Sequence, residues 1–219
     1  MQEDIKTRLV EVAGELFGER GYEAVGVREI CQQATANVAA VNYHFGDKRG
    51  LYVACLRHAQ SCRVDDLLLP LPADMPAAEK LRHFIRGMLE SKLDPTRPQW
   101  HLELMLREMG RPTDACSEIV EDYIRPMAES LAEIMQGLLP GDQWNRQTWM
   151  IGFSIIAQVL FYHVNQPVVR LLMGPDGFET LSLDVITDHI TRFSLAAIGQ
   201  GPPVDRNDPS DVAAPQSHK

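Results

Sequence analysis

The residues with the clearest chemical potential lie between positions 37 and 48. The amide of Asn42 can form two hydrogen bonds with the major-groove edge of an adenine. Ala39 and Ala40 are small enough to let a helix backbone approach the groove floor, and their methyl groups can contact thymine methyls. Lys48 supplies a positive charge where backbone N–H groups also favour a phosphate oxygen. This pattern predicts a DNA-reading face.

Other polar residues nearby extend this face. Tyr43 and His44 can reach a phosphate or a base, and Arg28 and Thr35 are further candidates for backbone contact. Taken singly, each of these residues is also an ordinary member of a solvated helix surface, and His44 can simply pack beside Phe45. The DNA-reading hypothesis therefore depends on the elements that hold these side chains together.

Three short helices are predicted around this face. The first begins near Ile5, carries an apolar stripe at intervals of three and four residues, and stops at Gly21. Gly14 inside it indicates a close packing contact, because glycine is unfavourable in a helix interior. The second spans 27–34 and buries Ile30. The third spans 38–45, with Asn37 as N-cap, and its inward face is formed by Val38, Val41 and Phe45. The second and third helices with their short turn form a helix-turn-helix.

The rest of the chain also reads as helical, so the predicted fold class is all-α. A fourth helix starts near Lys48 and runs towards Leu67, and the proline-rich segment 69–76 forms a turn. Further helices are expected at 77–93, 99–109, 114–138 with a kink at Pro126, 142–164 and 181–198, with an extra helical turn at 168–173 and a loop at 174–177. We expect a DNA-binding domain at 1–47, a helical ligand-binding and dimerisation domain at 48–199, and a disordered tail at 200–219.

Charge and composition exclude several classes of protein. The net charge is −9, which argues against a protein that coats nucleic acid nonspecifically. Residues 1–55 carry six basic and eight acidic side chains, so this segment is closer to neutral than the remainder and any DNA affinity comes from a localised face. No apolar run is long enough for a membrane span, and the N-terminus lacks the pattern of a secretory signal, so a cytoplasmic protein is expected. The four cysteines have no metal-site spacing, and no cofactor is expected.

A longer run of residues identifies a family. The stretch that resembles the signature of the TetR family of bacterial regulators is Ala36-Asn-Val-Ala-Ala-Val-Asn-Tyr-His-Phe-Gly-Asp-Lys-Arg-Gly-Leu51, preceded by Leu16-Phe-x-x-x-Gly-Tyr22 and Val27-Arg-Glu-Ile30. The resemblance to the CecR-type branch rests on Val41-Asn-Tyr-His-Phe-Gly46 with Arg107-Glu-Met109, Tyr123-Ile-Arg-Pro126, Phe161-Tyr-His163 and Pro167.

The resemblance implies roles for individual residues. It assigns base or groove contact to Asn37, Val38, Ala39, Ala40 and Asn42, and phosphate contact to Tyr43, His44 and Lys48. This chain departs from the commoner pattern at Thr35, where the family usually has a turn glycine, and at Asn42, where tyrosine is frequent. The first departure puts the turn geometry in question, and the second leaves phosphate anchoring to Tyr43.

The helical C-terminal part suggests a pocket and a partner but no catalytic site. Nothing after residue 60 forms a catalytic constellation, so an enzyme is not expected, and Glu79 with His83 reads as an exposed pair. The candidate pocket residues are Phe84, Met88, Trp100, Glu103, Arg107, Trp149, Phe153 and His163, each of which can equally be plain core. The candidate dimer residues are Ile151, Ile155, Val159, Ile186, Ile190, Phe193 and Ala197, although a well-packed monomer is the other interpretation.

These expectations combine into one functional hypothesis with an alternative. By its resemblance, the chain is expected to be a homodimeric repressor that binds double-stranded DNA at a near-palindromic operator and is released by a small, largely apolar effector. The alternative is a DNA-binding regulator without a small-molecule effector, controlled by a protein partner or by its abundance. A membrane partner is not expected.

Overall fold

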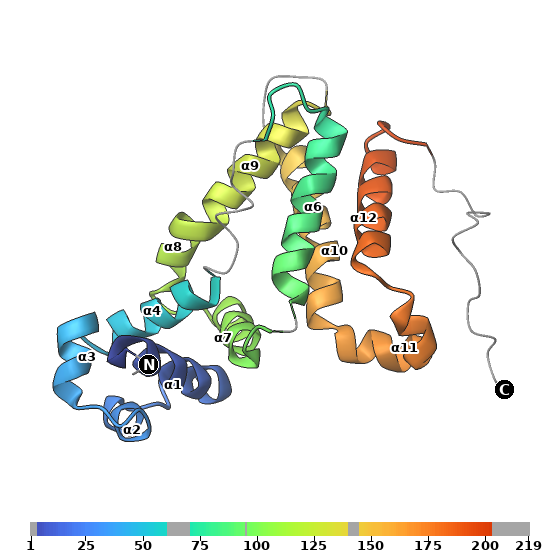
Figure 1. Cartoon of the computed structure of the whole chain (residues 1–219). Helices are drawn as coiled ribbons and strands as arrows, with labels where there is room; N and C mark the ends of the chain where they lie inside the picture. Colours follow the sequence, from blue (N-terminus) through green and yellow to red (C-terminus); the bar gives the residue numbers. More distant parts are fainter. Residues whose placement is uncertain (1–3, 61–70, 95, 140–144, 203–219) are drawn as a thin grey trace. The chain divides into compact units, whose positions relative to one another are not determined.

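The computed structural model describes residues 4–60, 71–94, 96–139 and 145–202, and every regular element in these ranges is a helix (Figure 1). The described residues divide into two compact units, each with its own hydrophobic core. The first unit comprises residues 1–65 and 95–126, and the second comprises 66–94 and 127–219. The chain therefore leaves the first unit and returns to it.

The first unit is built on three helices that follow the predicted pattern. They are α1 (Ile5–Arg20), α2 (Val27–Gln33) and α3 (Val38–Phe45). The Asp4 side chain caps α1, and α1 ends at Gly21, whose φ of 84° is accessible to glycine without strain. The prediction of three short helices that end in a helix-turn-helix is confirmed.

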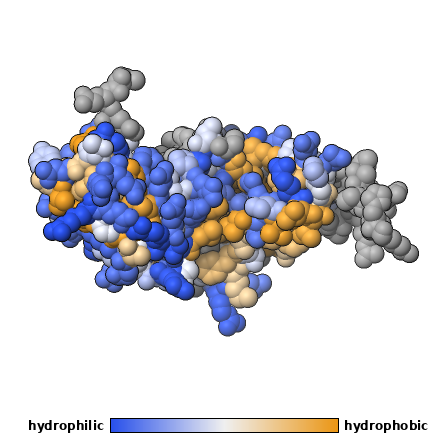
Figure 2. Space-filling view, turned by 90° about the horizontal axis from the view of Figure 1, so that it is seen from below, coloured by the Kyte–Doolittle hydropathy of each residue, from blue (hydrophilic) through white to orange (hydrophobic). Residues whose placement is uncertain are grey.

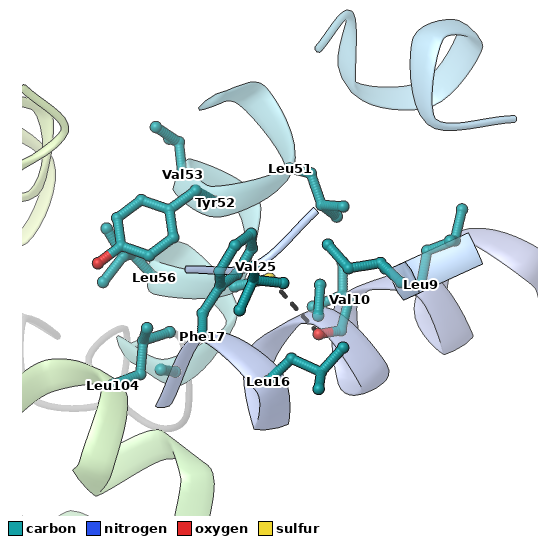
Figure 3. Packing of buried hydrophobic residues seen from close by; sticks show 14 of the residues in the cluster. Leu9, Val10, Leu16, Phe17, Val25, Leu51, Tyr52, Val53, Leu56 and Leu104 are labelled. Atoms are coloured by element: carbon teal, nitrogen blue, oxygen red, sulfur yellow. Dashed lines mark hydrogen bonds between the residues drawn. The ribbon is translucent and has the colours of Figure 1, made fainter. Parts of the chain in front are cut away.

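Two further helices complete the core of this unit. Tyr52 of α4 (Lys48–Gln60) packs edge-on against Phe17 of α1, and Leu51 and Leu56 of α4 with Leu104 of α7 (Gln99–Gly110) belong to the same buried cluster (Figure 3). The continuation of the fourth helix towards Leu67 lies outside the described residues. The predicted domain boundary at residue 47 stays a prediction, but in packing terms α4 and α7 share one core with the three helices before them.

Gly14 has the close contact that its place inside α1 indicated. A Cβ at this position would overlap the ring of Trp100, which lies flat against the helix. The indole N–H donates to Oε2 of Glu11, 3.0 Å away, so Trp100 is fixed at both its ring and its nitrogen. A glycine that is unfavourable for the helix thus allows α1 and α7 to approach each other.

The segment 114–138 differs from the single kinked helix that was predicted. It consists of α8 (Cys116–Ile119), the π-helix η1 (Val120–Ile124) and α9 (Arg125–Gln136). Pro126 cannot donate a backbone hydrogen bond, and its ring clashes with the carbonyl four residues earlier. The chain widens before the proline, and the Arg125 N–H donates to the carbonyl of Val120 across a π turn.

The second unit contains α6 (Ala77–Leu93), α9, α10 (Arg146–Val164), α11 (Gln166–Glu179) and α12 (Leu183–Ala197). Its core is formed mainly by buried apolar side chains of α6, α9, α10 and α12. The predicted loop at 174–177 is wrong except at Gly174, where φ is 73°. Pro175 follows this break directly, at a position where a helix tolerates proline, so the helix resumes at once. Of the predicted tail, residues 203–219 lie outside the described residues.

Thr35, in the turn of the helix-turn-helix, adopts a backbone conformation that favours glycine. Thr35 has a φ of 49°, a left-handed conformation that costs a β-branched residue about 1–2 kcal/mol. We expect Thr35→Gly to raise the free energy of unfolding by about 0.5–1 kcal/mol, since relief of strain exceeds the extra freedom of glycine in the unfolded chain. Urea denaturation measures this difference, and a destabilised variant would show that the threonine side chain contributes more than its backbone costs.

Candidate nucleic-acid interface

The helix α3 is held at both ends so that its outer side faces away from the core. Oδ1 of Asn37 accepts a hydrogen bond from the Ala39 N–H at 2.9 Å, which confirms Asn37 as the N-cap. The Gly46 N–H donates to the carbonyl of Asn42, and the φ of 83° at Gly46 turns the chain into α4. Inside, Val41 is fully buried and Phe45 packs beside it.

The exposed side of α3 carries the predicted base-reading residues. Ala39 and Asn42 are exposed, and Tyr43 is 84% exposed. Thr35 and Asn37, immediately before the helix, are exposed as well. A narrow row of small and polar side chains is therefore free to enter a DNA groove without moving the core.

Two residues of α3 differ from their predicted orientation. Val38 was expected on the inward face, yet it is 39% exposed and is not among the described side chains packed against the first core. It lies in the first turn of the helix, where the core that covers Val41 does not reach it. Ala40 was expected on the outer face but is half-buried against that core. The outward face is thus centred on Ala39, Asn42 and Tyr43, with Val38 at its edge.

The predicted phosphate-binding residues surround this face. The Nζ of Lys48 lies 4.3 Å from the centre of the Tyr22 ring, a cation–π contact that fixes the lysine at the start of α4. Arg28 is exposed in the first turn of α2, and His44 is half-buried between Tyr43 and Phe45. Glu29, the next residue of α2, accepts two hydrogen bonds of 2.6 and 2.8 Å from Arg20 of α1, and this guanidinium lowers the pKa of Glu29.

An ion-pair cluster joins α4 to the segment that follows α7. Arg49 binds Glu118 with a nitrogen–oxygen distance of 2.6 Å, and it also donates to the carbonyl of Asp114. Arg57 binds Asp122 at 2.7 Å and reaches Glu118 at 3.5 Å. Sequence analysis missed this cluster because its members lie more than sixty positions apart.

Comparison with known proteins identifies this architecture. Residues 9–55 match the family "Bacterial regulatory proteins, tetR family", and residues 77–198 match the C-terminal domain of the HTH-type transcriptional dual regulator CecR. The chain is a TetR-family regulator with a CecR-type C-terminal domain. Regulators of this family bind DNA, and the family consists of transcriptional regulators rather than enzymes.

Individual relatives agree with this assignment. The TetR-family regulator is 26% identical to the dual regulator CecR of Shigella flexneri over 86% of its own length and 89% of that protein. It is 32% identical to the transcriptional repressor AcnR of Corynebacterium glutamicum, over 43% and 44% of the two chains. Among solved structures, it shares the fold of AibR in complex with isovaleryl coenzyme A and operator DNA, with a TM-score of 0.58, 19% identity and coverage of 87% and 97%.

The predicted pocket residues of the regulator are divided between the two units. Trp100 packs on Gly14, and Arg107 donates to the carbonyls of Gly18 and Glu19, so both fasten α7 to α1 within the first unit. Glu103 in the same helix accepts from Gln99. In the second unit, Phe84 and Met88 lie in the core, His163 is half-buried, and Trp149 and Phe153 form an exposed aromatic pair.

The predicted dimer residues separate into core and surface. Four of them are buried inside their own unit and do not offer a contact surface, namely Ile155, Val159, Ile186 and Ile190. The reason is that α6 and α9 cover the side of α10 and α12 that carries them. Phe193 and Ala197 are exposed, and Ile151 is half-buried beside them. Figure 2 shows apolar surface over part of the second unit.

Two further findings concern membrane-spanning helices and metal sites. Among the described residues, no helix is both long and apolar enough to cross a membrane. No group of three or more histidine, cysteine, aspartate or glutamate side chains in the described ranges is arranged to hold a metal ion, and Glu79 and His83 are both exposed.

Proposed function

We propose that this regulator is a homodimeric repressor that reads a near-palindromic operator through the exposed face of α3 and loses DNA affinity when a small, largely apolar effector binds. The observation that carries the proposal is the arrangement of α3, in which Val41 locks the helix to the core while Ala39, Asn42 and Tyr43 stay exposed. Footprinting on the DNA upstream of the regulator's own gene tests it. A palindromic protected site is the expected result, and uniform protection without a preferred site would contradict it.

Asn42 is the residue on which sequence selectivity should depend most. Its amide can pair with one adenine at two points, so Asn42→Ala should weaken operator binding by about 1–3 kcal/mol and relax selectivity at one base pair of each half-site. Competition titrations with single-base operator variants measure both effects. As a control, Lys48→Ala should weaken binding to all duplexes alike. If Asn42→Ala left selectivity unchanged, the base-reading role would be wrong.

A second copy of the chain is the proposed partner of the face formed by α10 and α12. Met150 and Phe153 of α10 and Phe193 of α12 are 61%, 63% and 48% exposed. A groove of about 300 Å³ lies beside them between the two helices, lined by Ile151, Ser154 and Ala197 among others. An apolar face with a groove is suited to self-complementary packing, which would place two recognition helices about 34–36 Å apart on the DNA.

The dimer proposal predicts a change of mass in solution. Phe193→Glu places a charge in the centre of the proposed interface, and we expect it to yield a monomer by light scattering after size-exclusion chromatography. Leu171→Glu is the matched control, because Leu171 is an apolar residue of α11 that is 85% exposed outside this groove. A dimeric Phe193→Glu variant, or a monomeric wild-type protein, would overturn the proposal.

The effector is proposed to bind in the second unit. The support is the largely apolar core around Phe84 and Met88, together with AibR, a protein of the same fold that was solved with isovaleryl coenzyme A. A thermal-shift screen should reveal an apolar compound that stabilises the regulator and weakens operator binding. Silence across a broad panel would favour the alternative regulator, which has no small-molecule effector and is controlled by a partner or by abundance.

A further inference from the structure

A groove in the first unit extends the DNA-binding face beyond α3. It has a volume of about 770 Å³ and is open to solvent. The polar and basic residues that line it include Lys6 and Thr7 of α1, His44 of α3, and Arg49, Arg57 and His58 of α4. His44 belongs to α3, so the groove extends from one side of the recognition helix to the start of α1.

The side chains around this groove suit a phosphodiester backbone. Lysine and arginine provide positive charge, and the threonine hydroxyl and the histidine ring provide further hydrogen-bonding groups, all of which proteins use for DNA phosphates. Two carboxylates also line the groove, those of Asp4 and Glu118. Asp4 is engaged as the N-cap of α1, whereas Glu118 is engaged by Arg49.

We propose that Lys6, Thr7, His44 and Arg49 form a second phosphate-binding strip of the regulator, and that Glu118 competes with the DNA backbone for Arg49. The inference rests on the proposed mode of DNA binding, in which α3 enters the major groove of the DNA. Arg49 is 45% exposed in its side chain and Glu118 is 34% exposed, so the ion pair is accessible to a phosphate. In water such a pair is weak, and a phosphate that offers similar charge and geometry can replace the carboxylate.

This competition has a consequence for regulation. Glu118 belongs to α8, which continues through η1 to Pro126, the last residue of the first unit. Any shift of α8 away from α4 would release Arg49 for DNA, and any shift towards α4 would hold it. The strip therefore links DNA affinity to the position of a segment that leads into the second unit.

The test measures how binding depends on salt. The probe is a labelled duplex of random sequence, because nonspecific binding depends on phosphate contacts alone. Each phosphate that a cation neutralises contributes about 0.9 to the slope of log affinity against log salt concentration. We expect Arg49→Gln to lower the slope by about this amount, and Lys6→Gln to act likewise. Glu118→Gln should tighten binding severalfold at low salt, and this gain should be smaller in the Arg49→Gln background.

Arg125→Gln is the matched control. Arg125 is an exposed arginine of the first unit that pairs with Glu121, and it does not line the groove. Its slope should equal that of the wild type, and thermal unfolding reports any loss of stability separately. If Arg49→Gln left the slope unchanged and Glu118→Gln weakened binding, the cluster would be a structural clamp only and the inference would be overturned. If the wild type itself failed to bind the random duplex at low salt, the DNA-binding mode would fail with it.

Discussion

Replacement of Glu108 by alanine is expected to lower the free energy of unfolding by about 3–4 kcal/mol. The Glu108 side chain is buried, with the residue only 2% exposed, and it accepts three hydrogen bonds. The Tyr52 hydroxyl donates to one carboxylate oxygen at 2.8 Å, and the N–H and hydroxyl of Thr113 donate to the other at 2.9 and 3.0 Å. Alanine leaves three donors without an acceptor and opens a cavity, and each effect is unfavourable.

A double-mutant cycle separates these contributions. Tyr52→Phe removes one donor and should cost about 1–2 kcal/mol, and the double variant should cost less than the sum of the two single variants because they share one hydrogen bond. Urea denaturation followed by circular dichroism measures all four proteins. A cost below about 1 kcal/mol for Glu108→Ala would mean that water reaches the carboxylate.

The same pair affects stability at alkaline pH. Burial, together with the hydrogen bond to Glu108, raises the pKa of Tyr52 well above its ordinary value of about 10. Because the pKa of Tyr52 is higher in the folded than in the unfolded protein, the stabilisation that its neutral hydroxyl contributes to the fold is fully present at neutral pH. It is lost as the pH rises above the unfolded pKa towards the folded one.

The helices could be predicted because each leaves a local signal. The apolar stripe of α1, the cap at Asn37 and the stop at Gly21 act over a few residues, and the structure confirms them. The π-helix before Pro126 could not be predicted, because a proline indicates that the regular hydrogen-bond pattern fails but not how the chain compensates. Helix boundaries next to prolines and glycines are where the predictions differ most from the structure.

The candidate site was predictable only as far as it lies within one helix. The exposed row of Ala39, Asn42 and Tyr43 follows from winding the sequence at 100° per residue. The half-burial of Ala40 does not, because it depends on how closely neighbouring helices approach. Contacts between distant segments, such as Tyr52 with Glu108 and Arg49 with Glu118, depend on the return of the chain through α7 and α8, for which no local pattern exists.

Gly50 is a residue whose importance only the structure reveals. A Cβ at this position would lie on the carbonyl oxygen of Phe45, the last residue of α3. The Gly50 N–H also donates to Oδ1 of Asp47 at 2.8 Å, which fixes the first turn of α4. Any side chain at Gly50 must therefore displace backbone at the junction that sets the orientation of the recognition helix.

We expect Gly50→Ala to destabilise the regulator by about 2–3 kcal/mol and to weaken operator binding at least tenfold, since α3 would shift relative to α4. Gly26→Ala is the matched control, because the structure shows open space around Gly26 and its φ of −100° suits alanine. That variant should fold as the wild type does. Denaturation and operator titration of both variants measure the difference. Normal operator binding by Gly50→Ala would show that the recognition helix tolerates a displaced junction with α4. Its orientation would then depend on the core around Val41 instead.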